Sequence, residues 1–411
     1  MKTIFKILII LIVLCLIAFG VFWFFGQRGA GDESPFSDGV SIGDFFPFGT
    51  TGNTPTDNPP PGDTTPNTTS TGNVATQPAR FWQISSEPQS GAIAFIATGT
   101  PYVRYTDKAT GNVFESKLTL TGSTRISNTT VPKVYESLWQ NNGKMLVMRY
   151  LTSDRETIKS IVGTLTKMAT SSSEEIAFQE VKTSFLPDNI QSLSVEPTTG
   201  AIAYLVTNDT GGRVFVATAQ TPKQVYESAV KDFNLGWVNK TTIALNSKPS
   251  SVTPGQFYFL KSDTGALSRV LSGLTGLSAI ANASSSQVIY SESTNGGFQT
   301  SMFDIKTGAA SPLTIKTLAD KCVWSAKRSL VYCGVPKSPS SGRYPDDWYQ
   351  GRVSFDDAIW QIDTVSGTTK LLIDPETVGV SIDATNLSLD PNEQYVILTN
   401  KKDSRLWGLK I

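Results

Sequence analysis

A short acidic and aromatic segment around residue 347 holds the side chains of this sequence that are best suited to chemistry. It runs from Gly342 to Arg352, and Asp356 and Asp357 follow it. Amphipathic aromatic side chains of this kind anchor partners or stack on sugars. Clustered carboxylates offer the hard oxygen ligands that Ca²⁺ requires. The candidate ligand- or partner-binding residues are Tyr344, Asp346, Asp347, Trp348, Tyr349 and Arg352.

The alternative to a binding role is that this segment is purely structural. In that interpretation Trp348 and Tyr349 pin the segment to the neighbouring strands, since long ordered loops often use aromatics for their own packing. The carboxylates would then be solvated or would cap turns. We therefore assign no metal ligands, no catalytic residues and no cofactor to the segment.

The absence of histidine narrows the possible chemistry further. The chain has 411 residues, with 35 basic side chains, 35 acidic side chains and no histidine. A Ser-His-Asp triad, a Cys-His pair and an imidazole metal site are excluded. Carboxylate-only chemistry remains possible, because a glycosidase needs just two acidic groups at a set separation. A net charge of zero argues against a nucleic-acid surface, which usually needs a basic excess.

Two of the three cysteines flank one predicted hairpin. If residues whose numbers sum to 655 face each other, the turn falls at Lys327 and Arg328, and Cys322 faces Cys333. Directly opposed antiparallel residues have Cα atoms about 4.5–5.5 Å apart, which is close to the disulfide range. We predict a structural disulfide between Cys322 and Cys333, with two buried thiols as the alternative.

The N-terminal 28 residues predict a membrane anchor. The run from Ile7 to Phe25 has 19 residues and no charge, and as a helix it would span about 28 Å, close to the hydrocarbon thickness of a bilayer. Lys2 and Lys6 precede it, which favours a cytoplasmic N-terminus. A cleaved signal peptide and a lipoprotein signal at Cys15 are the alternatives.

Residues 29–79 predict a disordered linker. They contain five Asp and one Glu, no Lys or Arg, and long Thr/Pro/Gly/Asn tracts. Such a segment cannot bury enough apolar surface to offset its ordering entropy. The predicted organisation is therefore an anchor at 1–28 with a transmembrane helix at 7–25, a linker at 29–79 and a folded domain at 80–411.

The folded domain is built from a repeated hairpin. Each copy has a short strand, a polar turn and a stronger apolar strand, and the copies lie at 83–95, 138–148, 193–204, 236–245, 280–290, 323–332 and 387–397. Several of the spacings between copies are about 40–45 residues, the period of a four-stranded propeller blade. A turn ending in Thr-Gly or Ser-Gly recurs at 108–111, 262–265, 305–308 and 364–367. We expect it to join the third and fourth strands of a blade.

These motifs resemble the blades of TolB-like and WD40-like β-propellers, and residues 88–95, 197–204 and 359–367 match them best. The resemblance implies an all-β fold, a β-propeller of about seven four-stranded blades. A pair of β-sandwiches is the alternative. Residues 125–132, followed by Leu138 and Trp139, also resemble uncharacterised membrane-anchored propeller proteins of small-genome, candidate-phyla bacteria. That group has no established activity.

Ring closure and loop placement follow from this interpretation. The last blade supplies only three strands, so residues just before Phe81, for example 73–77, are expected to add its outer strand and so remove a free sheet edge. The segment 336–357 would then join the second and third strands of the sixth blade. In a propeller all such loops emerge on one face, around the mouth of the central channel.

The sequence thus predicts a non-catalytic binding or scaffold module outside the bacterial cytoplasmic membrane. It would be single-pass with its N-terminus inside, attached through the N-terminal helix, and its partner would be an unknown envelope protein or glycan, with no nucleic acid. The alternative function is a carboxylate-dependent hydrolase acting on envelope glycans, which rests on the acidic and aromatic segment alone.

Overall fold

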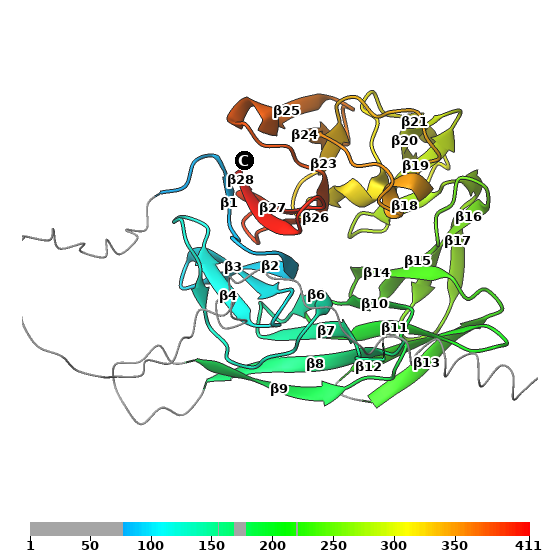
Figure 1. Ribbon diagram of the computed structural model, residues 1–411. Coiled ribbons are helices and arrows are strands. Elements are labelled where there is room, and N and C mark those ends of the chain that lie inside the picture. Colours follow the sequence, from blue (N-terminus) through cyan, green and yellow to red (C-terminus); the bar gives the residue numbers. More distant parts are fainter. Residues whose placement is uncertain (1–76, 155, 168–177, 219–220) are drawn as a thin grey trace, which may run out of the picture. The chain divides into compact units, whose positions relative to one another are not determined.

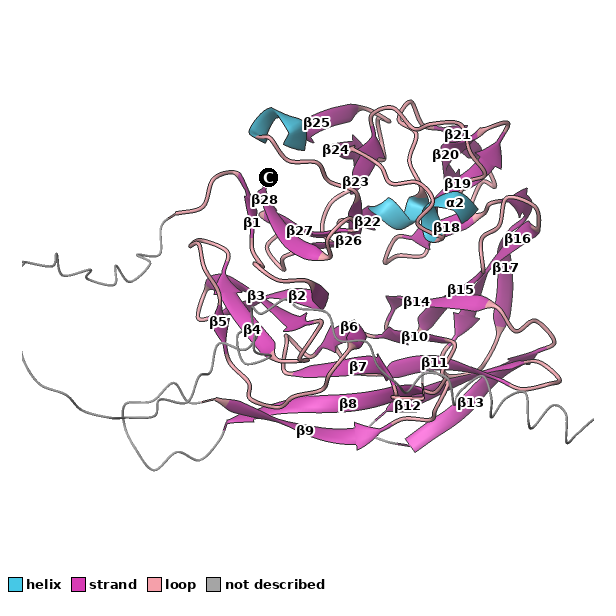
Figure 2. Ribbon diagram, viewed as in Figure 1, coloured by secondary structure: helices cyan, strands magenta, loops and turns pink. Residues whose placement is uncertain are grey.

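The computed structural model describes residues 77–154, 156–167, 178–218 and 221–411, and these are mostly β-strand (Figure 1). Their strands form seven antiparallel sheets of four strands each, arranged around a ring (Figure 2). The prediction of a seven-bladed β-propeller is confirmed. The predicted transmembrane helix at 7–25 and nearly all of the linker lie outside the described residues. Among the described residues, no helix is both long enough and apolar enough to span a bilayer.

The blades are numbered here along the chain, and each is given from the inner strand outward. Blade 1 contains β2 (Gln89–Ala97), β3 (Thr100–Asp107), β4 (Val113–Lys117) and β5 (Thr124–Arg125). Blade 2 contains β6 (Val134–Gln140), β7 (Met145–Leu151), β8 (Ile158–Lys167) and β9 (Gln179–Phe185). Blade 3 contains β10 (Ser192–Val195), β11 (Ile202–Thr207), β12 (Gly212–Thr218) and β13 (Thr221–Ser228). Blade 4 contains β14 (Phe233–Asn239), β15 (Thr242–Ser247), β16 (Pro254–Lys261) and β17 (Leu267–Thr275).

The remaining three blades include the short helices. Blade 5 contains β18 (Ser278–Ala281), β19 (Gln287–Thr294), β20 (Gly297–Asp304) and β21 (Ala310–Pro312). Blade 6 contains β22 (Cys322–Trp324), β23 (Leu330–Pro336), β24 (Asp357–Asp363) and β25 (Thr369–Ile373). Blade 7 contains β26 (Ala384–Leu389), β27 (Tyr395–Asn400), β28 (Arg405–Lys410) and β1 (Phe81–Gln83). The helices are η2 (Ala319–Lys321), α2 (Asp346–Tyr349) and η3 (Pro375–Val378).

The chain ends close the ring within blade 7. β1 pairs with β28, so that Phe81 faces Leu409 and Gln83 faces Trp407. Phe81 also stacks on the ring of Trp407, with 5.0 Å between the ring centroids. Closure by an N-terminal strand was expected, but the predicted residues 73–77 are wrong and the strand is Phe81–Gln83. Large buried aromatics at positions 81 and 82 give this segment the apolar surface that the polar residues before it lack.

Ring closure also corrects the first repeat. Six of the seven predicted hairpins, from 138–148 to 387–397, pair their two strands as expected. The copy at 83–95 does not, because its first strand joins blade 7 while its second strand, β2, becomes the inner strand of blade 1. Local alternation predicts a strand but not the sheet that the strand joins.

The recurrent Gly-containing turn has a common geometry. Gly111, Gly265, Gly308 and Gly367 all have φ between 71° and 75°, a conformation that favours glycine. In three of these turns an aspartate accepts a hydrogen bond from the backbone N–H three residues further on, as when Asp304 Oδ1 accepts from Thr307 (2.8 Å). The turn joins the third and fourth strands in blades 4, 5 and 6, as predicted. In blade 1 it joins the second and third strands, β3 and β4, because the inner position there is taken by β2.

Candidate functional site

The candidate residues all lie in one insertion on one face of the ring. We call this face the loop face: it carries the loops that join second to third strands within a blade and the connections from one blade to the next. The insertion joins β23 to β24 and contains α2. Figure 2 shows α2 on the inner side of the ring, near β18. Hydrogen bonds from the insertion reach loops of blades 4 and 7 and the end of β19 in blade 5.

Two aromatic side chains of the insertion, Tyr344 and Trp348, point into the protein. Tyr344 is 1% exposed and Trp348 is 3% exposed, and they share a buried cluster with Phe298, Leu318 and Phe355. The rings of Trp348 and Phe355 are stacked, with 6.2 Å between their centroids. In this position Tyr344 and Trp348 hold the insertion on the ring. The structural interpretation named Trp348 and Tyr349 for this role, and of these two Trp348 is buried while Tyr349 is partly exposed.

The two aspartates of α2 bind neighbouring chain segments. Asp347 Oδ2 accepts a hydrogen bond from the backbone N–H of Arg343 (2.8 Å), and Oδ1 lies 3.2 Å from Arg352 Nη1. The hydrogen bond from Arg343 lowers the pKa of Asp347. Asp346 accepts a hydrogen bond from the backbone N–H of Ser251 in blade 4 (2.6 Å). Burial raises the pKa of Asp346, but hydrogen bonds from Ser251 and Ser250 outweigh burial and leave the pKa below its usual value.

Tyr349 and Arg352 are the candidate residues that reach the surface. Tyr349 is 38% exposed, while its hydroxyl turns inward and donates to Asp320. Burial raises the pKa of Tyr349 well above its ordinary value, and the nearby Asp320 carboxylate adds to the effect. Arg352 is exposed. Across the part of the chain that the structure describes, no group of three or more His, Cys, Asp or Glu side chains is arranged to hold a metal ion.

Beneath the insertion lies a buried cluster of charges that sequence reasoning missed. Lys321 Nζ is 2.8 Å from Asp357 Oδ2 and 2.5 Å from Asp383 Oδ1, and all three side chains have no exposed surface. Nζ also faces the rings of Trp348 (4.8 Å) and Phe355 (5.2 Å). The available signal was weak. Charged residues stand beside apolar ones just before two inner strands, as Asp320 and Lys321 after Ala319 and as Asp383 between Ile382 and Ala384.

Glycine makes room for this cluster. A Cβ added to Gly334 of β23 would lie 3.1 Å from Asp357 Oδ2 and 2.7 Å from Ala384 Cβ. Gly334 directly faces Ile359, near the start of β24. A larger side chain at position 334 would therefore push the Asp357 carboxylate away from Lys321.

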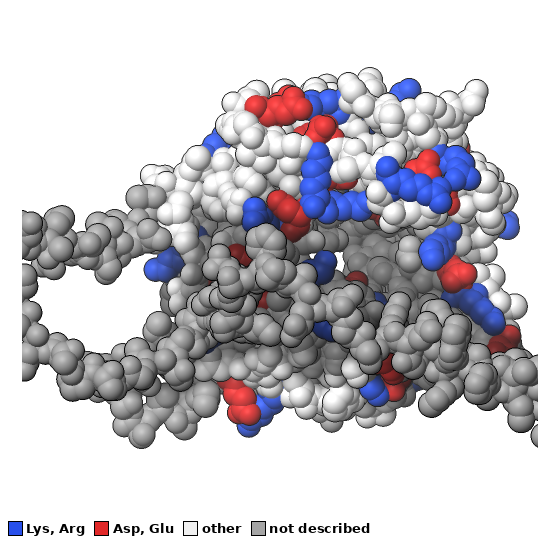
Figure 3. Space-filling view, in the orientation of Figure 1, with Lys and Arg blue, Asp and Glu red and all other residues white. Residues whose placement is uncertain are grey.

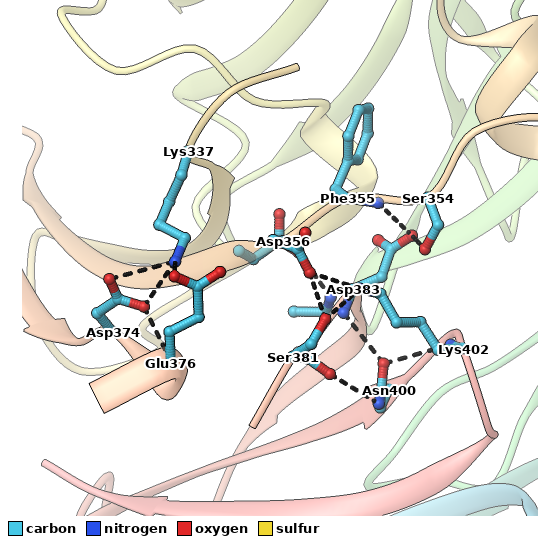
Figure 4. Close-up of polar contacts among 12 residues, drawn as sticks. Lys337, Ser354, Phe355, Asp356, Asp374, Glu376, Ser381, Asp383, Asn400 and Lys402 are labelled. Carbon is cyan, nitrogen blue, oxygen red and sulfur yellow. Dashed lines mark hydrogen bonds and ion pairs between the residues drawn. The ribbon is translucent and has the colours of Figure 1, made fainter. Parts of the chain in front are cut away.

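An outer polar network lies beside Asp383 of the buried cluster (Figure 4). Lys337 Nζ lies 3.0 Å from Asp374 Oδ1 and 2.5 Å from Glu376 Oε2. Lys402 Nζ lies 2.5 Å from Asp356 Oδ1 and also bonds Ser381. The residues around Lys337 line an open polar pocket of about 440 Å³. On the surface visible in Figure 3, Lys and Arg are interspersed with Asp and Glu, so the visible part of this face carries no extended area of one charge.

The cysteine pair stands next to the buried cluster. Cys322 faces Cys333 in the β22–β23 hairpin, in the register that the sequence predicts, and the two form a disulfide. Lys321 and Cys322 are adjacent, so the disulfide and the buried charges hold the same corner of blade 6.

The described fold is that of an all-β, seven-bladed propeller with a polar cluster under one loop. No protein-family model matches the chain, and no curated protein matches it either. Solved structures that resemble it include the tricorn protease, with a TM-score of 0.49 at 10% identity. That match covers 82% of this chain and 34% of the tricorn protease. The β-propeller domain of the Trilobed protease from Pyrococcus furiosus gives a TM-score of 0.49 at 9% identity, over 79% of this chain and 96% of that one.

TolB from Acinetobacter baumannii is a further match, with a TM-score of 0.41 at 12% identity over 78% of this chain and 79% of that one. The chain thus spans about a third of the tricorn protease and most of the other two. At these scores and identities the matches assign neither a family nor an activity to this chain.

Proposed function

We propose that this chain is a non-catalytic binding or scaffold module, anchored to the bacterial membrane and exposed outside it, that binds a protein partner of the cell envelope through the loop face. The observation that carries the proposal is the uneven distribution of exposed apolar side chains. Of the ten large hydrophobic side chains exposed among the described residues, seven lie on the loop face: Tyr135, Leu151, Phe185, Val230, Val252, Tyr349 and Val378.

Exposed apolar side chains favour protein partners when they gather on one face. The other three, Leu267, Val365 and Leu371, lie at the opposite turns or on an outer strand. A disulfide between Cys322 and Cys333 supports an extracytoplasmic location, because such bonds persist in oxidising compartments. The anchor at 7–25 supplies the membrane attachment in this proposal.

The alternative of a carboxylate-dependent hydrolase has weaker support. Asp357 and Asp383 are brought together by Lys321, but both are fully buried and cannot meet a glycan. Asp346 and Asp347 each accept hydrogen bonds from backbone N–H groups. Activity of the full chain on a cell-wall polymer that disappears in both Asp346→Asn and Asp347→Asn would favour the hydrolase over the binding module.

The binding proposal is tested with two matched double variants of the full-length chain. Phe185→Asp with Val252→Asp alters the loop face, where these side chains are 71% and 75% exposed. Val365→Asp with Leu371→Asp alters exposed apolar residues elsewhere (83% and 46%). We expect affinity capture from envelope extracts of the native cell to recover a specific partner with the wild type and the control, and to lose it with the loop-face variant. Equal recovery with both variants, or no specific partner with the wild type, contradicts the proposal.

A further inference from the structure

The buried lysine and two aspartates have the geometry of a condensation site. Lys321 Nζ lies 2.8 Å from an oxygen of Asp357 and 2.5 Å from an oxygen of Asp383. The amine is covered by the rings of Trp348 and Phe355, and none of the three side chains has exposed surface. Groups held this close in a dry site react as though at very high concentration, because the entropy of bringing them together is already lost.

As separate ions these three groups are expensive to bury. Removing a charge from water carries a large desolvation penalty, which is offset only when every polar atom finds a partner. Asp357 Oδ1 is buried and has no hydrogen-bond partner among the described residues. Its other oxygen, Oδ2, accepts from the backbone N–H of Ala384 (2.6 Å) and contacts Lys321. A cluster of ion pairs alone does not explain why Asp357 Oδ1 is buried without a partner.

The pKa values of the two carboxyl groups are shifted in opposite directions. Asp383 accepts hydrogen bonds from Trp348 Nε1 (3.0 Å), Ser354 Oγ (3.0 Å) and the backbone N–H of Phe355 (3.0 Å). Burial raises the pKa of Asp383, but Lys321 and these donors outweigh burial and leave the pKa below its usual value. Burial also raises the pKa of Asp357, to about 6, despite the nearby Lys321. Asp383 thus stays ionised and can accept a proton from Lys321, which lies 2.5 Å away, and Asp357 is the more readily protonated of the two carboxyl groups.

We propose that Lys321 and Asp357 condense to an intramolecular isopeptide bond, with Asp383 as the base. The Lys321 ammonium gives one proton to the Asp383 carboxylate, and the neutral amine attacks Cγ of protonated Asp357. A C–N bond forms, the bond from Cγ to one oxygen breaks, and that oxygen leaves as water with the carboxyl proton and the second amine proton. Asp383 ends protonated, so one ammonium and one carboxylate become neutral and no oxidant or further reactant is needed.

The bond would give blade 6 a second covalent tie that reducing agents cannot cut. The disulfide joins β22 to β23, and the amide would join Lys321, directly before β22, to Asp357 at the start of β24. Together they would link the first three strands of this blade. The proposal concerns chemistry within the propeller and does not depend on the loop-face partner.

Peptide mapping of the purified full-length chain tests the bond. After complete reduction, alkylation and denaturation, trypsin should leave residues 317–327 joined to residues 353–370, uncleaved after Lys321 and lighter than the two peptides by one water. The matched control, Lys321→Arg, keeps the charge and should give the two peptides separately. Free 317–321 and free 353–370 from the wild type overturn the proposal. Attachment of 317–327 to residues 371–401, which contain Asp383, overturns the choice of Asp357.

The role of Asp383 is tested separately. Asp383→Asn keeps the size of the side chain but removes the base, so the linked peptide should fall to a small fraction of its wild-type yield in freshly purified, folded protein. Near-ultraviolet circular dichroism identifies whether the variant is folded. A folded variant that forms the linked peptide in the wild-type yield overturns the assignment of Asp383 as the base.

Discussion

Blade 7 is held on its two sides by different kinds of contact. Toward blade 1, the described residues form a joint of apolar side chains with a few hydrogen bonds. Trp82, Ile397 and Leu406 of blade 7 pack with Val103 and Tyr105 of blade 1. Gln89 Nε2 donates to Thr399 Oγ1 across the joint (2.8 Å), and no ion pair links the two blades within the described residues.

Toward blade 6, charged groups accompany the apolar packing. Asp383 contacts Lys321, Lys402 contacts Asp356, and Glu393 binds the turn of blade 6. Glu393 accepts hydrogen bonds from Ser325 Oγ (2.7 Å) and from the backbone N–H of Ala326 (2.8 Å). It also forms an ion pair with Arg328 (3.1 Å). Apolar contact stabilises without selecting one geometry, whereas buried charges are costly in every arrangement but the paired one. The charged joint therefore fixes how the insertion sits, and the apolar joint closes the ring.

The largest expected effect comes from removing the closing strand. Deleting Leu406–Ile411 takes away β28, which pairs with both β27 and β1. Blade 7 would keep only the β26–β27 pair, and β1, which pairs with β28, would leave the sheet, so that the chain ends would no longer close the ring. We expect differential scanning calorimetry to show no cooperative unfolding transition. Lys410→Ala, at an exposed side chain of the same strand, is the control and should unfold like the wild type. A deletion variant with an unchanged transition would show that this closure is wrong.

The second effect concerns the cover of the charged joint. Trp348→Ala removes a buried ring that stacks on Phe355. It also removes the indole N–H that donates a hydrogen bond to Asp383. We expect the free energy of unfolding to fall by about 3–5 kcal/mol, the usual range for truncating a buried large aromatic side chain. Denaturant titration measures the change. Gln350→Ala, at an exposed side chain two residues further on, is the control and should change stability by no more than about 0.5 kcal/mol. A fall as small as the control's would mean that Trp348 does not anchor the insertion.

The sequence predicts contacts within a blade better than contacts between blades. The register that pairs Cys322 with Cys333 follows from alternation and turn position alone, and it also places Val323 opposite Tyr332. The predicted hairpin at 83–95 is wrong because Gln83 belongs to β1, whose partner, β28, lies at the far end of the chain.

The candidate site shows the same limit. Alternation and turn signals located the insertion between β23 and β24, but a four-residue helix gives no periodic pattern to say which side chains face inward. Tyr344 and Trp348 point inward because Phe298 of blade 5 and Phe355 offer an apolar surface there. Lys321, Asp357 and Asp383 come from three separate segments, and only the packing of blades 6 and 7 brings them together.

The smallest of the three effects is a pH-dependent one at the same joint. Burial raises the pKa of Glu393, but hydrogen bonds from Ser325, Arg328 and the backbone N–H groups of Lys327 and Ala326 outweigh burial and lower the pKa below its usual value. A lowered pKa in the folded state adds stability above the unfolded pKa, about 4.3, and that stability is lost as the pH falls through the folded value.

Glu393→Gln keeps the shape of the side chain and removes its charge. At pH 7 we expect unfolding to need about 1–3 kcal/mol less free energy, because charge-assisted hydrogen bonds to a buried carboxylate are lost. The difference from the wild type should shrink below about pH 4, where Glu393 of the unfolded wild type takes up a proton and folding must release it. Urea titrations of both proteins between pH 7 and pH 3 measure it. Glu376→Gln, in the exposed ion pair with Lys337, should lower stability by at most about 1 kcal/mol. A stability loss in Glu393→Gln no larger than that in Glu376→Gln at every pH would contradict the role of buried charge in the joint between blades 6 and 7.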